Sequence, residues 1–401
     1  MKYRNLLFIF LLSVFASCSK DPELEPDTPP STFKVRIDNV IHETYFDSYP
    51  QGPSLFVPYL VMSGLPEGEK LLAFGGYYSP ENPNPDGSDY TFIHDCADDE
   101  LIQGWDWTQE LIYSAGWIDL PIPGKTYYFK GVVRTNKAVY YSNTVTINTD
   151  GLPGYTPGPQ DRVLPVVFHV MPRKDGTYPH PYFFDEMLAC ANRLYRNVWP
   201  LPGLADAGIR FVPATHAPDG TALSTPGIHY LDERYELDLD ISNEELRQWV
   251  GDNLWEMTEV INVWVSPFIN DHIVSEDTST AGFTFLPYFA PEEMLQGCNT
   301  AVPGCFSGIF LNQEIVGNGY CNSGIAVFAH EAGHYLGLDH VFEEDWCDDT
   351  PQYDRARYRT EQYIPGIDTY LRYPIDASAE PYTALNVMDY DIVIYSGITP
   401  Q

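Results

Sequence analysis

The segment from Gly324 to Gly337, GIAVFAHEAGHYLG, constrains most strongly what this chain can fold into. Its apolar residues predict a buried helix, in which the polar side chains of His330, Glu331 and His334 would be costly unless they are used. Residues four apart lie on the same face of a helix, so the imidazoles of His330 and His334 can point at one ion. The segment therefore predicts a helix built around a metal.

The residues after this helix extend the pattern. Gly337 permits a left-handed backbone, which ends a helix in a sharp turn and can bring His340 back as a third metal ligand. Three protein ligands with an open fourth position are typical of a catalytic zinc site rather than a structural one. Glu331 can reach a ligand on such an ion without binding the ion itself. The alternative is that these are incidental polar residues on a buried helix. The occurrence of His330, Glu331, His334 and His340 together at this spacing disfavours that alternative.

Residues 330–340, HEAGHYLGLDH, match every specified position of the metzincin zinc-peptidase signature, so the chain resembles that family. The sequence NVMDY at 386–390 resembles the methionine turn beneath the metal of metzincins. Three further stretches resemble the pappalysins in particular. They are HVFEEDWCDDTP after the third histidine, and PVVFHV and VINVWV earlier in the chain. The resemblance covers roughly residues 164–395.

The resemblance implies a role for several residues. Glu331 would be the general base that takes a proton from water, and the substrate would be a protein or peptide. Met388 would form an apolar floor under the histidines. The alternative, an ordinary core methionine, differs little from this role. Tyr390 matches a tyrosine that approaches the zinc or the oxyanion in several metzincins, and a plain buried tyrosine is the alternative.

Cysteines and acids near the motif leave further alternatives open. CDDTP, from Cys347 to Pro351, offers the hard oxygen ligands that calcium prefers, as in related pappalysins, but a capped turn explains the same residues. The family carries more cysteines after the third histidine than the one found here, so its disulfide pairing does not carry over. Cys96 is predicted to be a structural cysteine of a β-domain, with a zinc-capping thiol as the alternative.

The first 17 residues have the features of an export signal. Lys2 and Arg4 precede a short apolar run that cannot span a bilayer, and Cys18 follows a pair of small residues. This arrangement resembles a bacterial lipobox, which implies a lipid anchor at Cys18 in the outer membrane or on the cell surface. An ordinary secretory signal is the alternative. Residues 18–32 are polar and proline-rich, so they predict a flexible tether.

Residues 33–149 predict an all-β sandwich. Aromatic and β-branched runs at 31–40, 54–62, 70–78, 125–135 and 138–148 alternate with turn signals, which is typical of short antiparallel strands. The run LPIPGKTYYFKGVV resembles fibronectin type III domains, in which a tyrosine (here Tyr127 or Tyr128) makes a corner. No catalytic pattern occurs in this part, so a spacer or an immunoglobulin-like binding module is expected.

Glycine and proline are dense in residues 150–160, which predicts a linker. From residue 161 to 401 the chain alternates apolar strands with helices expected at 183–199, 243–258 and from about Gly324. That order predicts an α/β domain with a mixed sheet, an active-site helix and an irregular lower part after His340. The fold class expected is therefore multidomain, with an all-β sandwich followed by a metzincin-like zinc peptidase domain.

Overall charge excludes one class of partner. The formal net charge is -34, so nothing in the chain could neutralise a run of phosphates, and nucleic acid is excluded. The leading hypothesis is a secreted or surface-anchored zinc endopeptidase. A surface adhesion lipoprotein with a vestigial peptidase domain is the alternative, and a zinc hydrolase of non-peptide substrates is a third. The intact His330, Glu331, His334 and His340 favour the first.

Overall fold

The computed structural model describes residues 32–44, 54–119, 121–199, 201, 203–234, 236–238, 244–269, 281–284, 308–314, 321–342, 351–354, 363–364, 369–376, 378–383, 385–389 and 397–399. The expected signal, the lipid attachment at Cys18 and almost all of the tether lie outside these residues. Among the residues that are described, no helix combines the length and the apolar character needed to cross a membrane.

Two antiparallel four-stranded sheets make up residues 34–148. One sheet contains β1 (Lys34–Thr44), β2 (Ser54–Ser63), β5 (Leu111–Ser114) and β6 (Ile118–Asp119); the other has the order β4 (Tyr90–Asp95), β3 (Leu71–Ser79), β7 (Thr126–Thr135), β8 (Val139–Asn148). A single turn of helix, α1 (Glu100–Gln103), follows β4. The inner faces of both sheets contribute to one apolar core, so this part is all-β; its fibronectin type III assignment stays a prediction.

The rest of the chain is built on a six-stranded mixed sheet of order β10-β9-β13-β16-β15, with β11 also paired to β9. Its strands are β9 (Arg162–Val170), β10 (Ile209–Pro213), β11 (Ile228–Tyr230), β13 (Ile261–Ser266), β15 (Gly282–Thr284) and β16 (Ile309–Asn312). All pairings are parallel except that of β15, which runs antiparallel to β16. The expected mixed sheet is therefore present.

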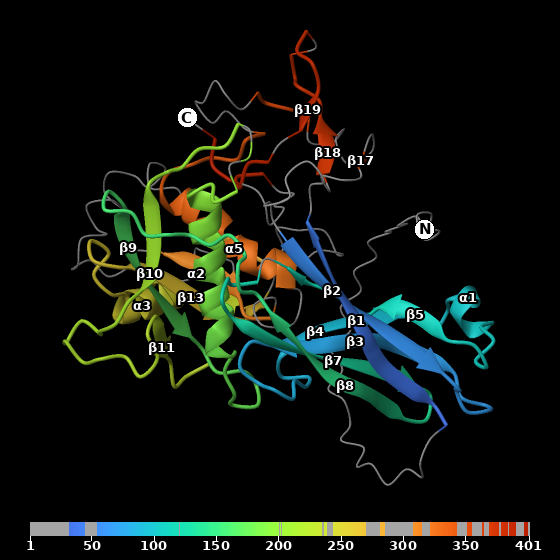
Figure 1. Ribbon diagram of the computed structural model, residues 1–401. Coiled ribbons are helices and arrows are strands. Elements are labelled where there is room, and N and C mark those ends of the chain that lie inside the picture. Colours follow the sequence, from blue (N-terminus) through green and yellow to red (C-terminus); the bar gives the residue numbers. More distant parts are fainter. Residues whose placement is uncertain are drawn as a thin grey trace.

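Among the described residues, three helices accompany this sheet: α2 (Pro181–Tyr195), α3 (Glu244–Asn253) and α5 (Cys321–Tyr335). Two small sheets complete the described part. One pairs β12 (Leu237–Asp238) with β14 (Phe268–Ile269), and the other has the order β17 (Tyr363–Ile364), β18 (Thr369–Arg372), β19 (Tyr382–Thr383). The last three lie beyond the carboxyl end of α5, apart from the main sheet (Figure 1).

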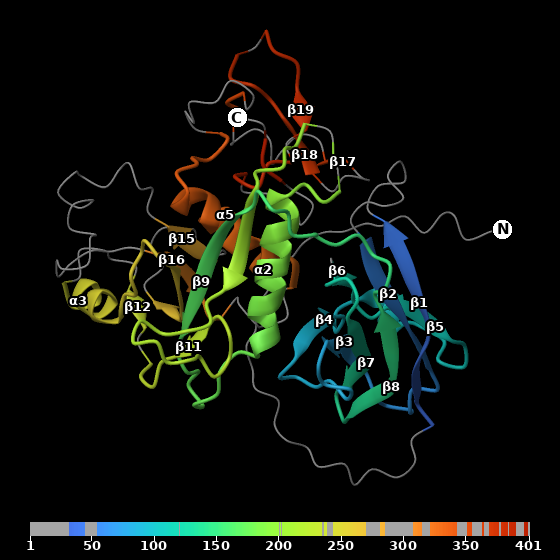
Figure 2. The same ribbon diagram turned by 60° about the vertical axis from the view of Figure 1, so that its left-hand side comes forward.

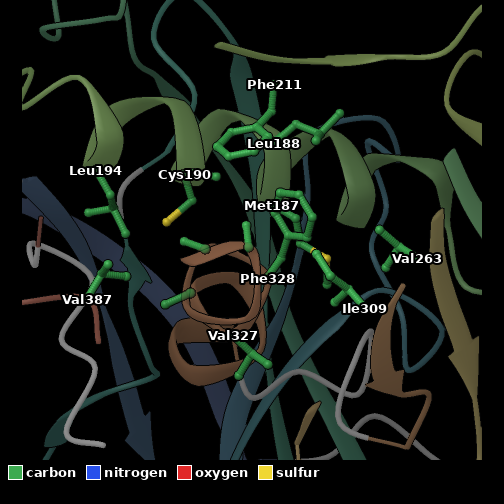
Figure 3. Packing of buried hydrophobic residues seen from close by; sticks show 14 of the residues in the cluster. Met187, Leu188, Cys190, Leu194, Phe211, Val263, Ile309, Val327, Phe328 and Val387 are labelled. Carbon is green, nitrogen blue, oxygen red and sulfur yellow. The ribbon is translucent and has the colours of Figure 1, made fainter. Parts of the chain in front are cut away.

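Both faces of the main sheet are covered, and successive side chains of its central strand pack into two different apolar clusters. Val263 and Val265 of β13 pack in the cluster formed with α2 and α5, whereas Trp264 between them packs with Val250 of α3 and with Phe310. Successive side chains of a strand point to opposite faces, so a strand buried on both sides must be apolar throughout. Helices α2 and α5 meet over the first face, with Val387 alongside them (Figure 3).

Helix α2 joins the two parts of the molecule, standing between the main sheet and the β-sandwich in both views (Figures 1 and 2). Tyr182 and Phe183, from its first turn, are buried in the core of the β-sandwich, and the ring of Phe183 stands edge-on to Tyr90 at 4.4 Å. Further along α2, the buried carboxylate of Glu186 accepts hydrogen bonds from the hydroxyls of Tyr90 and Tyr127. The two parts therefore share a core, which a detached spacer would not.

Other contacts along α2 extend this junction. Tyr182 donates a hydrogen bond of 2.9 Å to Asp89, and the buried guanidinium of Arg193 donates one of 2.9 Å to the carbonyl of Pro121. Ile325 of α5 packs against the cores of both parts. The β-sandwich thus touches α2 and α5, the two helices on one face of the main sheet.

We expect Tyr127→Phe to lower the free energy of unfolding by about 1–3 kcal/mol, because Tyr127 also accepts a 2.9 Å hydrogen bond from the amide of Ile122. Amide exchange along α2 should rise as well, since Glu186 loses a donor. Denaturant unfolding and hydrogen exchange measure both effects. The neighbouring Tyr128→Phe, on the half-buried side of the same strand, is the control. Unchanged exchange in α2 would mean that the two parts unfold independently.

A buried histidine on β9 gives the fold a pH dependence. Asn262 Oδ1 accepts from the amide of Trp255 and lies 2.9 Å from His169 Nε2, so that nitrogen must carry a proton. The other nitrogen of His169 then accepts from His229 Nδ1 at 2.9 Å. The neutral ring is satisfied, and burial lowers the pKa of His169 to about 3.

Acid should therefore destabilise the fold through His169. Below about pH 6.5 this histidine is protonated in the unfolded chain, whereas in the folded protein it stays neutral down to about pH 3. Between these values its contribution to the free energy of unfolding falls by about 1.4 kcal/mol for each unit by which the pH is lowered. We expect His169→Gln to make the pH dependence of stability shallower by that amount, and the exposed His216→Gln to leave it unchanged. Equal slopes in the wild type and His169→Gln, measured by denaturant unfolding from pH 7 to pH 4, would contradict this account.

Candidate metal centre

Helix α5 carries the first two histidines on its buried side. The helix forms because its run of apolar residues packs under α2, where Ala326, Phe328 and Ala329 are fully buried. His330 and His334 lie one turn apart and are buried, and the distance between their Nε2 atoms is 3.2 Å. The spacing therefore places both rings on the same face of the helix, with their Nε2 atoms close together, as the helical period requires.

The end of α5 determines where His340 lies. The helix ends at Tyr335, and Gly337 has a φ of +99°, in the left-handed region that favours glycine. The amide of Leu338 donates to the carbonyl of Gly333 at 2.9 Å, and the amide of Gly337 donates to that of His334 at 2.9 Å. This pair of bonds is a Schellman motif, which reverses the chain after a helix.

After this reversal the chain returns past the helix. His340 Nε2 then lies 3.1 Å from His334 Nε2, and one ligand atom from each of the three histidines lies within 4.8 Å of the others. Gly337 thus has the backbone that a third ligand at His340 requires.

The outer nitrogens of the first two histidines are committed to hydrogen bonds. His330 Nδ1 donates to the carbonyl of Val387 and His334 Nδ1 donates to the carbonyl of Leu338, both at 2.7 Å. A carbonyl only accepts, so each Nδ1 carries the proton of its neutral ring. Burial lowers the pKa of His330 to about 3 and also lowers the pKa of His334, so both rings are neutral near pH 7. Their Nε2 atoms therefore face each other as two lone pairs.

Two facing lone pairs repel unless a cation lies between them, so the donor set fits a metal ion. Two nitrogen ligands of a tetrahedral zinc, each ~2.0–2.1 Å from the ion, lie about 3.3–3.4 Å apart. The separations of 3.2 Å and 3.1 Å around His334 are close to that value. Imidazole nitrogen is also a donor that zinc prefers. The residues present therefore suit zinc, with His330, His334 and His340 as the three ligands.

Glu331 lies beside the histidines and is itself buried. Burial raises the pKa of its carboxyl to about 8, and the hydroxyl of Thr284 on β15 opposes this rise. Strand β15 passes very close, because a Cβ on Gly282 would lie 3.1 Å from Cγ of Glu331. A carboxyl held in an apolar site next to a metal centre is a suitable group to exchange protons with a reacting water.

Met388 is buried and packs against Gly333 of α5, between the first two histidines in the sequence. A Cβ on Gly333 would lie 2.1 Å from Sδ of Met388, so only glycine allows this contact. The turn that carries Met388 is held by its own amide, which donates to Asn386 Oδ1 at 2.8 Å. The amide of Val341, next to His340, donates to the carbonyl of Met388.

Sequence reasoning missed two residues that support this centre. Gly333 is one; a glycine inside a helix is destabilising by roughly 1 kcal/mol relative to alanine, and that signal could have indicated a close neighbour. The other is Tyr195 of α2, whose buried hydroxyl donates to the carbonyl of Ala329 at 3.0 Å. Nothing in the sequence around Tyr195 pairs it with a helix 134 residues away.

Several expected site residues lie outside the described part of the chain. They are Tyr390, the acids and cysteine of 347–350, and Cys18. Cys96, by contrast, packs in the core of the β-sandwich, and burial raises the pKa of its thiol to about 12. It is therefore a structural cysteine, as predicted, and not a thiolate that caps a metal.

Comparison with known proteins assigns the region around this centre. Residues 244–396 match the model of a peptidase family described as pregnancy-associated plasma protein-A. These residues are therefore similar to pappalysin-like metallopeptidases. The matched residues include α5 and the turn that carries Met388. No curated protein sequence matches the chain.

Some solved structures resemble the chain loosely. Mirolysin in complex with a compound is 17% identical, over 60% of this chain and 87% of that one, with a TM-score of 0.42. Mature mirolysin of Tannerella forsythia with a cleaved peptide is 18% identical, over 60% of this chain and 95% of that one, with a TM-score of 0.38. The similarity to a peptidase family is that of residues 244–396 and does not rest on these similarities of backbone.

We expect the protein, purified without added metal, to contain about one zinc ion per chain, the number that one three-histidine site holds. His334→Ala should bring the zinc content close to zero, because it removes the central nitrogen of the three. The control is the exposed His216→Ala, which should retain the metal. Elemental analysis checks all three proteins, and zinc-free wild type would contradict the assignment of the site.

Proposed function

We propose that the protein is a zinc-dependent endopeptidase that hydrolyses peptide bonds of extracellular proteins or peptides. The observation that carries this proposal is the convergence of the Nε2 atoms of His330, His334 and His340 beside the buried carboxyl of Glu331. The match of residues 244–396 to a peptidase family supports the choice of a peptide substrate.

The chain's own residues divide the work. When bound, zinc supplies a Lewis acid that polarises a carbonyl and lowers the pKa of water toward ~7. His330 and His334 would present their Nε2 lone pairs to the ion, because their Nδ1 protons are bound by backbone carbonyls. Glu331 takes the proton of the attacking water and passes it to the nitrogen of the leaving amine. Tyr390, one residue after Asp389, remains the candidate to stabilise charge on the carbonyl oxygen.

The competing hypothesis of a vestigial peptidase on an adhesion lipoprotein requires a damaged site. Here the three histidines converge, the helix stop at Gly337 is in place, and Glu331 is beside them. An active enzyme is therefore the better supported of the two.

The remaining features of the proposal come from the sequence. Export and a lipid anchor at Cys18 would place the enzyme in the bacterial outer membrane or on the cell surface, reaching outward on the tether of residues 18–32. The domain division expected from the sequence, with a β-sandwich at 33–149 and a peptidase domain from 161, is part of the same proposal. Calcium is not included, because no described residue supports it.

Glu331→Gln should leave zinc content and fold intact and reduce turnover by roughly two to four orders of magnitude, the usual scale for losing a general base. Cleavage of a proteome-derived peptide library, read by mass spectrometry, measures the rate and shows which bonds are cut. The exposed Glu259→Gln is the matched control and should cleave like the wild type. If Glu331→Gln cleaves as fast as the control, another group activates the water.

A further inference from the structure

A buried cluster of three side chains lies behind the metal centre. Arg372, at the end of β18, is fully buried, and so is Asp389, which follows Met388. Arg372 Nε donates to Asp389 Oδ2 at 2.9 Å, and Nη2 lies 2.9 Å from the same oxygen. Tyr353, also buried, donates its hydroxyl to Asp389 Oδ1 at 2.8 Å. Both carboxylate oxygens are thus bound by donors from other segments.

One arm of this cluster reaches His330. Asp389 belongs to the turn of residues 386–389, and its amide donates to the carbonyl of Asn386 at 3.1 Å. The carbonyl of Val387 in that turn is the acceptor that orients the ring of His330. Holding the Asp389 side chain therefore holds the acceptor that points Nε2 of His330 at the metal.

The other arm reaches His340. The ring of Tyr353 stands edge-on to Phe342 with centroids 5.9 Å apart, and Phe342 stacks on the imidazole of His340 at 4.7 Å. The guanidinium carbon of Arg372 lies 5.4 Å from the centroid of the Tyr353 ring. Tyr353 is therefore shared between the aromatic stack behind His340 and the carboxylate behind His330.

Stability alone does not account for such a cluster. Burying an ion pair brings little net stability, because the loss of hydration offsets the attraction between the charges. Groups that orient metal ligands from behind, by contrast, change metal affinity or activity about 10–100-fold when they are removed. We propose that Tyr353 and Arg372 are positioning residues for the metal centre, which act through Asp389 on His330 and through Phe342 on His340.

The inference rests on the zinc site proposed above, and zinc binding tests it directly. In Tyr353→Phe the ring keeps its contacts and only the hydroxyl is lost, so we expect the zinc dissociation constant to rise about tenfold or more. Competition of the full chain with a zinc chelator measures that constant. The cobalt-substituted protein should also show a changed visible absorption spectrum, because the geometry of the ligands changes. Arg372→Lys keeps the positive charge without the planar contact with Tyr353, and should shift both readouts in the same direction.

Tyr90→Phe is the matched control, because it also removes a buried tyrosine hydroxyl from a carboxylate, that of Glu186 at the junction with the β-sandwich. It should lower stability without changing zinc affinity or the cobalt spectrum. The inference would be overturned if Tyr353→Phe and Arg372→Lys had the zinc affinity and the cobalt spectrum of the wild type, even if both variants were less stable. If Arg372→Lys fails to fold, Tyr353→Phe decides. If the wild type binds no zinc, the proposed function itself is wrong. If the wild type binds zinc and the variants bind it equally well, only the positioning role is wrong.

Discussion

Two buried imidazole nitrogens, 3.2 Å apart and both without a proton, impose the constraint on which the rest of this structure depends. Their protons are held on the opposite side of each ring, by the carbonyls of Val387 and Leu338. Neither carbonyl belongs to the regular part of helix α5. The metal centre therefore requires that a helix end and a distant turn be held in place relative to one helix face.

The surroundings of α5 meet that requirement through small residues and buried polar contacts. Gly333 lets the turn of Met388 approach the helix, and Gly337 lets the chain reverse toward His340. Tyr195 connects α2 to the carbonyl of Ala329, one residue before the first histidine. A side chain at position 333 would meet the sulfur of Met388, and one at position 337 would strain the left-handed backbone before His340.

The use of arginine fits the same picture. The chain has 22 lysines and arginines against 56 acids, so positive side chains are scarce. Two arginines are nevertheless buried at junctions: Arg193 binds the carbonyl of Pro121 across the boundary with the β-sandwich, and Arg372 binds Asp389 behind the metal centre. Together with the Glu186 network, they connect separate segments to α2 and to the turn of residues 386–389. The β-sandwich is consequently part of the support of α2, which in turn packs on α5.

The sequence alone determined the features that depend on local spacing. The period of the helix put His330 and His334 on one face, the glycine at 337 ended that helix, and alternation along the strands indicated a β-sandwich followed by a mixed sheet. It did not indicate β4, β5 or β6, whose short runs lack clear alternation. It also placed the start of α2 two residues late, since Pro181 begins the helix, and its end at residue 199 instead of Tyr195. Only the tertiary structure decided which groups lie behind the ligands. The carbonyl of Val387, the hydroxyl of Tyr195 and the Arg372–Asp389 pair come from segments far apart in the chain, and contacts of that kind leave no periodic signal in a sequence because packing, not local conformation, brings them together.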